Sequence, residues 1–155
     1  MKIEWKISPF ASLSTEELYA ILKLRQQVFV VEQHCAYQDC DGRDRNAHHL
    51  TGWLDTGKGA EPIAYLRIIP PKKEDQFLLI GRVVTHPEYR GKSLGKEIMT
   101  RCLHTIKRRY PKSPVRISAQ TYLTSFYENF GFRISSDGYL EDGIPHVEMT
   151  ISPTA

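Results

Sequence analysis

Cysteine is scarce in this sequence, and long apolar runs are missing from it. Its 155 residues include three cysteines, Cys35, Cys40 and Cys102, and an odd, sparse set argues against a disulfide-stapled scaffold. No stretch approaches the ~20 apolar residues that a membrane-spanning helix needs. The first residues, MKIEWKISPF, contain no apolar run of signal-peptide length. These absences lead us to expect a cytoplasmic protein without a membrane partner.

Neither positive nor negative charge strongly predominates, because the formal net charge is only +3. The densest basic run, Lys107-Arg108-Arg109, falls late in an expected helix, where cations suit the negative end of the helix dipole. We therefore expect no nucleic-acid partner, and steeply salt-dependent binding to DNA or RNA would be the sign of one. The length suits a single domain over residues 1–155, and the 41% apolar fraction suits a packed core.

Hydrophobic periodicity predicts alternating strands and helices. Ser14 and Glu17 have capping-box spacing and open a helix that reaches about residue 31. A second helix is expected from Gly91 to Tyr110 and a short one from Tyr122 to Phe130. Strands are predicted at residues 3–7, 49–54, 62–69, 77–85 and 115–119, with a closing hairpin within 132–152. This order indicates an α/β fold whose mixed, largely antiparallel sheet is flanked by helices.

The segment VVTHPEYRGKSLGKEIM, residues 83–99, is typical of a strand, a tight glycine turn and the start of a helix. Gly91 and Gly95 lack a β-carbon, so the backbone can approach a ligand closely there. The first amides of a helix have no intrahelical acceptor, and together with the helix dipole they suit an anion such as phosphate. Arg90 and Lys92 add positive charge beside them. A plain strand-to-helix connection explains the glycines equally well from spacing alone.

This segment resembles the coenzyme A loop of the GNAT N-acetyltransferase superfamily, whose pattern is [Q/R]-x-x-G-x-[G/A]. Arg90, Leu94 and Gly95 match the pattern, whereas Ser93 stands where the central glycine is usual. FYENFGF, residues 126–132, resembles the tyrosine-containing helix of the family and its Gly-Phe end. LRQQVFVVEQHCAYQDCDG and EDGIPHVEM resemble the ElaA-like subfamily. The likeness covers roughly residues 18–149.

The resemblance implies a GNAT-like acyl-CoA N-acyltransferase fold, with acetyl-CoA as co-substrate and no metal. The acceptor would be an amine on a small molecule or a protein, and a homodimer is expected on the same ground alone. Gln120 stands where the family often has an asparagine for the pantetheine, and Val83 and Val84 match the strand that holds the pantetheine and the acetyl carbonyl. The pyrophosphate would rest on the backbone amides of Arg90, Gly91, Lys92, Ser93, Leu94 and Gly95, with Lys96 just behind.

Tyr127 matches the tyrosine that the family uses as a general acid. The chemistry favours such a group, because a phenol beside the sulfur can protonate the thiolate as it leaves. A backbone amide of the opened strand can stabilise the oxyanion that precedes that step. The alternative for Tyr127 is a core aromatic on the apolar face of its helix.

The group that takes the proton from the amine stays open among Glu32, His49, His146 and a chain of water molecules. Glu32 lies where the first helix gives way to a polar loop. His146 begins a strand and carries an imidazole, which titrates near neutrality. Residues that suit the acceptor are Arg67 and Arg82 for an acidic group, and Asp39, Asp41 and Asp44 for a cationic amine.

Two rival interpretations remain. The first is a zinc site, for which Cys35 and Cys40 have a suitable spacing; its further ligands would be drawn from His34, His48 and His49. Adjacent histidines on a strand point to opposite faces, which weakens this interpretation. The second is a non-catalytic acyl-CoA-binding or protein-interaction module of the same fold, because Ser93 and Gln120 depart from the family pattern. Cys102 falls on an apolar helix stripe and is expected to pack as a small hydrophobe.

Overall fold

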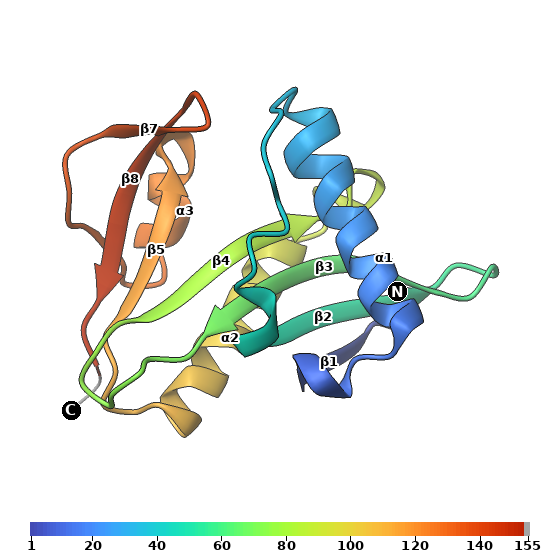
Figure 1. The fold of residues 1–155 in the computed structure, drawn as a ribbon, viewed down its shortest axis with the longest axis horizontal. Coiled ribbons are helices and arrows are strands. Elements are labelled where there is room, and N and C mark those ends of the chain that lie inside the picture. Colours follow the sequence, from blue (N-terminus) through green and yellow to red (C-terminus); the bar gives the residue numbers. More distant parts are fainter. Residues whose placement is uncertain (154–155) are drawn as a thin grey trace.

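The computed structural model describes residues 1–153, and its central element is an eight-stranded sheet. The strands are β1 (Glu4–Pro9), β2 (His48–Asp55), β3 (Ala60–Ile69), β4 (Leu78–Thr85), β5 (Val115–Gln120), β6 (Arg133–Ile134), β7 (Tyr139–Glu141) and β8 (Ile144–Ile151). They follow the order β1-β2-β3-β4-β5-β8-β6, with β7 paired to β8 (Figure 1). The pairing of β4 with β5 is parallel and the others are antiparallel. The predicted mixed, largely antiparallel sheet is confirmed.

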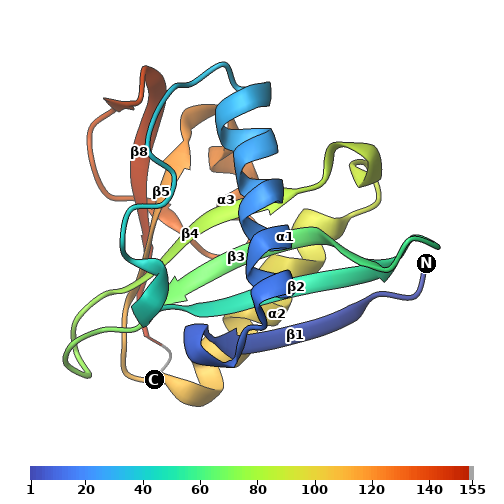
Figure 2. The same cartoon turned by 45° about the vertical axis from the view of Figure 1, so that its right-hand side comes forward.

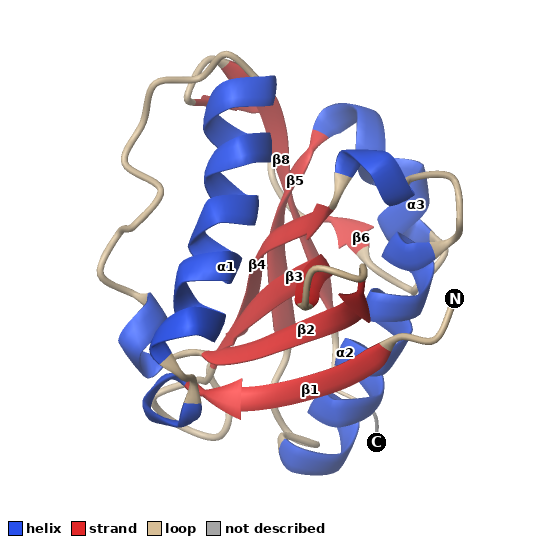
Figure 3. Ribbon diagram, turned by 90° about the vertical axis from the view of Figure 1, so that its right-hand side faces the viewer, coloured by secondary structure: helices blue, strands red, loops and turns tan. Residues whose placement is uncertain are grey.

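Helices cover both faces of this sheet. They are α1 (Thr15–Arg25), the π-helix η2 (Gln26–Glu32), α2 (Leu94–Arg109) and α3 (Thr124–Glu128), with short 3-10 turns at Phe10–Ser12, Asp44–Asn46, Pro87–Tyr89 and Thr121–Leu123. Figure 2 shows α1 in front of β2 and β3, and Figure 3 shows α2 and α3 on the opposite face. Within residues 1–153, none of these helices has the length and apolar character to span a membrane.

The first helix starts as predicted and ends differently. Ser14 Oγ accepts a bond of 3.0 Å from the Glu17 amide, and Glu17 Oε1 accepts one of 2.9 Å from the Ser14 amide, which confirms the capping box. The helix reaches Glu32, close to the predicted end, but its last seven residues form a π-helix. Such wide turns are rare and often lie at functional sites.

The core has one apolar layer on each side of the sheet. On one side, α2 buries the predicted stripe of Leu94, Ile98, Cys102 and Ile106, together with Met99. On the other side, α1 and the start of the π-helix bury Ile21, Leu24 and Val28 against Trp53, Tyr65 and Val84.

The sheet is split between β4 and β5. These strands pair only from Leu78 to Ile80 and from Val115 to Ile117, and then they diverge (Figure 1). Just beyond the last pair, β4 contains a bulge in which Leu66 of β3 faces both Arg82 and Val83. Arg82 has a left-handed φ of 53°. An extra residue of this kind leaves a strand locally unpaired and increases its twist, so the bulge helps to open the split.

The C-terminal hairpin is more elaborate than predicted. The sequence pattern indicated two strands, whereas three short segments pair here: β6 and β7 both run antiparallel to β8. Asp142 and Gly143, with φ values of 51° and 78°, form the tight turn between β7 and β8. An Asp-Gly pair is a strong signal for such a turn, and it places the side chains of β7 over the split.

Candidate functional site

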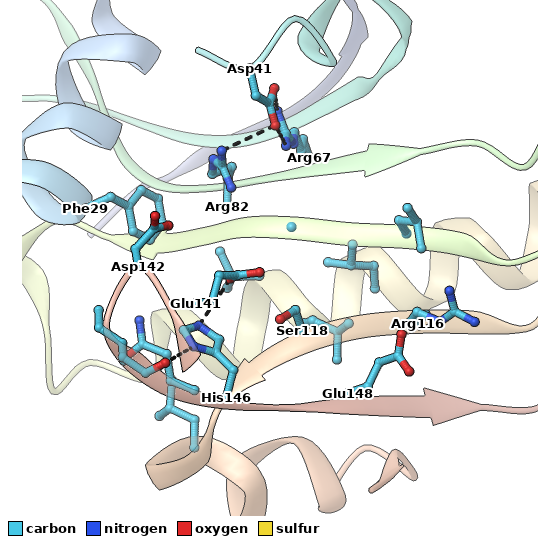
Figure 4. Close-up of a pocket in the computed structure, with 18 of the residues that line it drawn as sticks. Phe29, Asp41, Arg67, Arg82, Arg116, Ser118, Glu141, Asp142, His146 and Glu148 are labelled. Atoms are coloured by element: carbon cyan, nitrogen blue, oxygen red, sulfur yellow. Dashed lines mark hydrogen bonds and ion pairs between the residues drawn. The ribbon is translucent and has the colours of Figure 1, made fainter. Parts of the chain in front are cut away.

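A cleft of about 580 Å³ occupies the split in the sheet. Its walls are β4, β5, the loop after the π-helix, and the β7–β8 hairpin, as Figure 4 shows. Four residues that the sequence nominated for the cofactor or for catalysis line this cleft, namely Val83, Gln120, Tyr127 and His146. The fold therefore brings together side chains that are far apart in the sequence.

A second cavity, of about 550 Å³, lies in front of the first turn of α2. Gly91 and Ser93 on its wall have left-handed φ values of 80° and 59°. The Ser93 side chain caps none of the α2 amides among the residues described. The amides of the first turn are thus available to an anion, with the positive end of the helix dipole behind them. A left-handed backbone explains why glycine is usual at the position of Ser93.

Eight of the ten predicted cofactor-binding residues divide between these two cavities, and Lys92 and Val84 line neither. Lys92 turns to the ring of Tyr89, with Nζ 5.7 Å from the ring centroid. Val84 is buried against α1, so only Val83 of the valine pair lines the cleft. A β-carbon on Gly95 would lie 3.5 Å from the Phe126 ring, so the helix start packs closely against α3. The predicted residues that line the second cavity are Arg90, Gly91, Ser93, Leu94, Gly95 and Lys96.

Tyr127 lies on α3, is 5% exposed and lines the cleft. Its ring packs edge-on against Phe126, at a centroid distance of 5.1 Å, and against Phe132, at 6.1 Å. Burial raises the pKa of the Tyr127 phenol, because the charged phenolate is disfavoured away from water. The hydroxyl therefore stays protonated at neutral pH, as a proton donor must.

The three candidate bases have different surroundings. His146 lines the cleft, with Nδ1 2.7 Å from the Ile144 carbonyl oxygen and Nε2 3.4 Å from Glu141 Oε2. Glu32 is outside the cleft lining and forms a two-bond ion pair of 2.7 and 3.1 Å with Arg90. His49 is 1% exposed on the α1 side of the sheet and bonds the Tyr65 hydroxyl at 2.7 Å. Only His146 shares the cleft with Tyr127.

Sequence reasoning missed a buried network that we call the arginine–aspartate cluster, which consists of Arg25, Arg67, Arg82, Asp39, Asp41 and Asp44. Arg25 is fully buried and reaches Asp39 at 2.8 Å and Asp44 at 2.7 Å. Arg67 bonds Asp41 at 2.6 Å and Asp44 at 3.0 Å. One signal was available: Arg25 lies on the α1 face that buries Ile21 and Leu24, and arginine is rarely buried without a partner.

The cluster corrects two expectations about the acceptor. Arg67 and Arg82 were candidates for an acidic group, and the aspartates for a cationic amine, but these charges pair with one another instead. Hydrogen bonds from Arg67 hold the pKa of Asp41 well below its usual range. The ionised cluster fastens the loop after the π-helix onto β3 and β4, and it forms one wall of the cleft (Figure 4).

The opposite wall comes from β5, β7 and β8. Arg116 Nε lies 3.0 Å from Glu148 Oε1, and the hydroxyls of Ser118 and Tyr139 are hydrogen-bonded to each other. Glu141, across the hairpin from Ile144, reaches His146. The Asp-Gly turn was the signal that placed these β7 side chains opposite β8, and the sequence interpretation did not use it.

The residues of the hypothetical zinc site are dispersed. Cys35 Sγ lies 3.2 Å from the Asp142 carbonyl oxygen, and Cys40 is exposed. His48 bonds Tyr110 on the α2 side of the sheet, opposite to His49. Over residues 1–153, no three His, Cys, Asp or Glu side chains form a group that suits a metal ion. Cys102 is fully buried, as expected, and burial raises the pKa of its thiol.

Proteins of known structure share both the sequence pattern and the fold of this chain. ElaA of Escherichia coli strain K12 is 42% identical over 149 residues, which cover 95% of each chain. The crystal structure of E. coli ElaA has a TM-score of 0.88 at 40% identity and covers 96% of this chain and 99% of its own. An acyl-CoA N-acyltransferase from Pseudomonas aeruginosa has a TM-score of 0.88 at 42% identity, with the same coverage. The predicted fold is confirmed.

At lower sequence identity, other solved structures share only the fold. An aminoglycoside 6′-N-acetyltransferase, solved in complex with coenzyme A, has a TM-score of 0.66 at 12% identity and covers 95% of this chain and 96% of its own.

A sequence profile of the acetyltransferase (GNAT) domain matches residues 57–153, which include β3, β4, the glycine turn, α2 and the β7–β8 hairpin. With ElaA among its relatives, this chain belongs to the GNAT acetyltransferase family.

Proposed function

We propose that this protein is an N-acetyltransferase that moves an acetyl group from acetyl-CoA to a primary amine by direct attack in a ternary complex. The observation that carries the proposal is the split between β4 and β5, because the cleft that holds Tyr127 lies in it and the phosphate-suited turn at the start of α2 comes after β4. The distant aminoglycoside acetyltransferase binds coenzyme A on the same fold, which supports acetyl-CoA as the donor.

The donor would extend from one cavity to the other. The free amides of Leu94, Gly95 and Lys96 would hold the pyrophosphate at the helix N-terminus. Beyond Ile80, β4 has no strand partner on the β5 side among the described residues. An extended chain with amide groups, such as pantetheine, can bond to such a free strand edge. Val83 and Gln120 both line the cleft and would contact it.

The reaction needs an oxyanion site and a proton donor. As the amine nitrogen bonds to the acetyl carbon, the carbonyl oxygen takes on negative charge. The bulge at Arg82 and Val83 supports a backbone amide of β4 as the donor to that oxygen, because a bulge leaves a backbone group without its ladder partner. When the carbon–sulfur bond breaks, the protonated phenol of Tyr127 gives its proton to the thiolate.

The amine must lose a proton as it attacks. We favour His146 over Glu32 as the group that receives it, because His146 lines the cleft whereas Glu32 is engaged with Arg90. The Ile144 carbonyl oxygen orients the imidazole through Nδ1, which leaves Nε2 as the basic atom. Glu141, 3.4 Å from Nε2, would stabilise the imidazolium that forms. A His146→Gln variant should lose turnover with each acceptor and keep its affinity for acetyl-CoA.

The test is a thermal melt with acetyl-CoA, with ATP and NAD as control ligands, followed by a panel of amines. At about 100 times its dissociation constant, acetyl-CoA should raise the melting midpoint by roughly 5–11 °C. Transfer to an amine, measured as release of free CoA thiol, would then establish the reaction. Binding without transfer to any amine would instead indicate the non-catalytic module, and no shift at millimolar acetyl-CoA would refute both.

A further inference from the structure

Residues 29–35, which we call the strap, connect the two cavities of the site. The strap comprises the end of the π-helix and the first residues of the loop that follows it. Figure 2 shows the chain leaving this helix in the direction of β8. Its beginning and its end, Phe29 and Cys35, line the cleft, whereas Glu32 in its middle reaches the glycine turn.

The contact with the turn is specific in its geometry. Both terminal nitrogens of Arg90 donate to the carboxylate of Glu32, at 2.7 and 3.1 Å. Arg90 also reaches the Thr85 carbonyl oxygen at the end of β4, at 3.4 Å. Arg90 lines the cavity that precedes α2. Glu32 of the strap and the Thr85 carbonyl oxygen therefore hold this cation together when no anion occupies that cavity.

The other contact of the strap is with the β7–β8 hairpin. Cys35 Sγ lies 3.2 Å from the carbonyl oxygen of Asp142, a residue with a left-handed φ of 51° in the hairpin turn. Phe29 and Asp142 both line the cleft, and Figure 4 shows them at the same end of it. The strap thus crosses the open end of the split, from the turn that follows β4 to the hairpin that follows β5.

We propose that Glu32 is a positioning residue through which the phosphate-binding turn controls access to the acceptor side of the cleft. The inference rests on the proposed function only in taking the cavity before α2 as the site of a pyrophosphate. Glu32 then acts through its ion pair with Arg90 and not as a base, and the π-helix serves to place Glu32 beside the glycine turn.

The electrostatic argument is a competition for Arg90. The Arg90 and Glu32 side chains are 43% and 38% exposed, so water screens their attraction. A pyrophosphate at the start of α2 brings several negative charges to the same guanidinium, and the helix dipole favours it further. Arg90 then turns to the phosphate, and the Glu32 carboxylate, repelled by the same charges, moves away. The strap follows, its contact with Asp142 loosens, and the cleft opens.

Cys35 is a built-in reporter of this motion. It is 9% exposed and lies in the cleft, whereas the cavity before α2 is lined by other residues. Inorganic pyrophosphate is a suitable probe, because it occupies the turn without reaching Cys35. The exposed Cys40 is removed by Cys40→Ser, and Cys102 is too deeply buried to react. The rate of Cys35 alkylation by iodoacetamide is then measured with and without pyrophosphate.

In the Cys40→Ser protein, which is the parent of the other variants, pyrophosphate should raise the alkylation rate of Cys35 by about two- to fivefold. This factor corresponds to the free energy of one exposed ion pair. Adding Glu32→Gln should raise the rate by a similar factor without pyrophosphate, and pyrophosphate should then have little further effect. Glu88→Gln is the matched control, since it removes an exposed carboxylate just before the turn. It should keep both the slow rate and the response.

Equal alkylation rates in the parent and in Glu32→Gln would overturn the proposal, whatever pyrophosphate does. So would pyrophosphate that stabilises the parent in a thermal melt yet leaves the Cys35 rate unchanged. Failure of the proposed function has a different signature: neither pyrophosphate nor acetyl-CoA stabilises the protein, while Glu32→Gln still exposes Cys35. A melting midpoint of Glu32→Gln close to that of the parent confirms that both are folded.

Discussion

The carboxylate of Asp44 accepts a hydrogen bond of 2.7 Å from the guanidinium of Arg25, a side chain with no exposed surface. The same carboxylate accepts one of 3.0 Å from Arg67 on β3. Asp44 therefore fastens the end of α1 and the loop that follows it to the centre of the sheet. The geometry of the cleft depends on this attachment, since the loop forms one of its walls.

Replacing Arg25 by alanine should be severely destabilising. The change leaves Asp39 and Asp44 buried with too little positive charge, and loss of one partner of a buried pair costs about 3–5 kcal/mol of unfolding free energy. Urea denaturation at pH 7 measures the effect. The exposed neighbour Lys23, changed to alanine, should alter the unfolding free energy by less than about 0.5 kcal/mol. A similar small change in Arg25→Ala would show that the cluster contributes little to stability.

The stability of the protein should fall in acid because of Asp41 and Asp44. Hydrogen bonds from Arg67 lower the pKa of Asp41. Burial alone would raise the pKa of Asp44, but Arg25 and Arg67 outweigh it and lower the value. A carboxyl whose pKa is lower in the folded state stabilises the fold above its unfolded pKa of ~3.9, and that contribution is lost as the pH falls through the folded value.

We therefore expect the unfolding free energy to decline below about pH 4, more steeply in the native protein than in Asp41→Asn. At pH 7 the variant should be the less stable of the two, and the difference should shrink as the pH is lowered toward 3. Urea denaturation at several pH values gives the curves. A difference that stays constant over this range would contradict the assignment of the lowered pKa to Asp41.

Tyr127→Phe should impair turnover without impairing binding. The phenylalanine ring keeps the contacts with Phe126 and Phe132 but lacks the hydroxyl that we propose as the proton donor to the thiolate. We expect kcat to fall by about 10²-fold or more, the usual weight of a positioned acid, with the acetyl-CoA dissociation constant nearly unchanged. Tyr122→Phe serves as the control, because Tyr122 is 76% exposed. Equal turnover by the two variants would assign Tyr127 to the core alone.

Gly91→Val should separate binding from stability when it is compared with Gly57→Val. Both glycines have left-handed φ values, 80° and 87°, and neither has an atom within 4 Å of a β-carbon built on it. Each change should therefore cost about 1–2 kcal/mol of unfolding free energy through backbone strain. Only Gly91 lies at the cavity before α2, so only Gly91→Val should weaken acetyl-CoA binding, by about tenfold or more in calorimetry. Equal affinities of the two variants for acetyl-CoA would indicate that the pyrophosphate binds elsewhere.

Local features of this protein were readable from the sequence. The capping box at Ser14, the apolar stripe of α2 and the glycine turn before it depend on residues a few positions apart. Their energetics are those of a single turn or a single helix face, which periodicity and spacing describe directly. Family resemblance added the fold and the placement of Tyr127 beside the split.

Only the tertiary structure decided which charges meet. Arg25, Asp44, Arg67 and Arg82 lie on four different elements, and the choice of partner for a charged side chain depends on the packing of those elements. The pairing of Glu32 with Arg90, across 58 positions of the chain, is of the same kind. Arg67 and Asp44 were expected to be free to bind an acceptor, but both are buried, and burial without a partner is too costly for a charge. The fold therefore pairs them with one another, at 3.0 Å, and places Tyr127 and His146 together on the lining of the cleft.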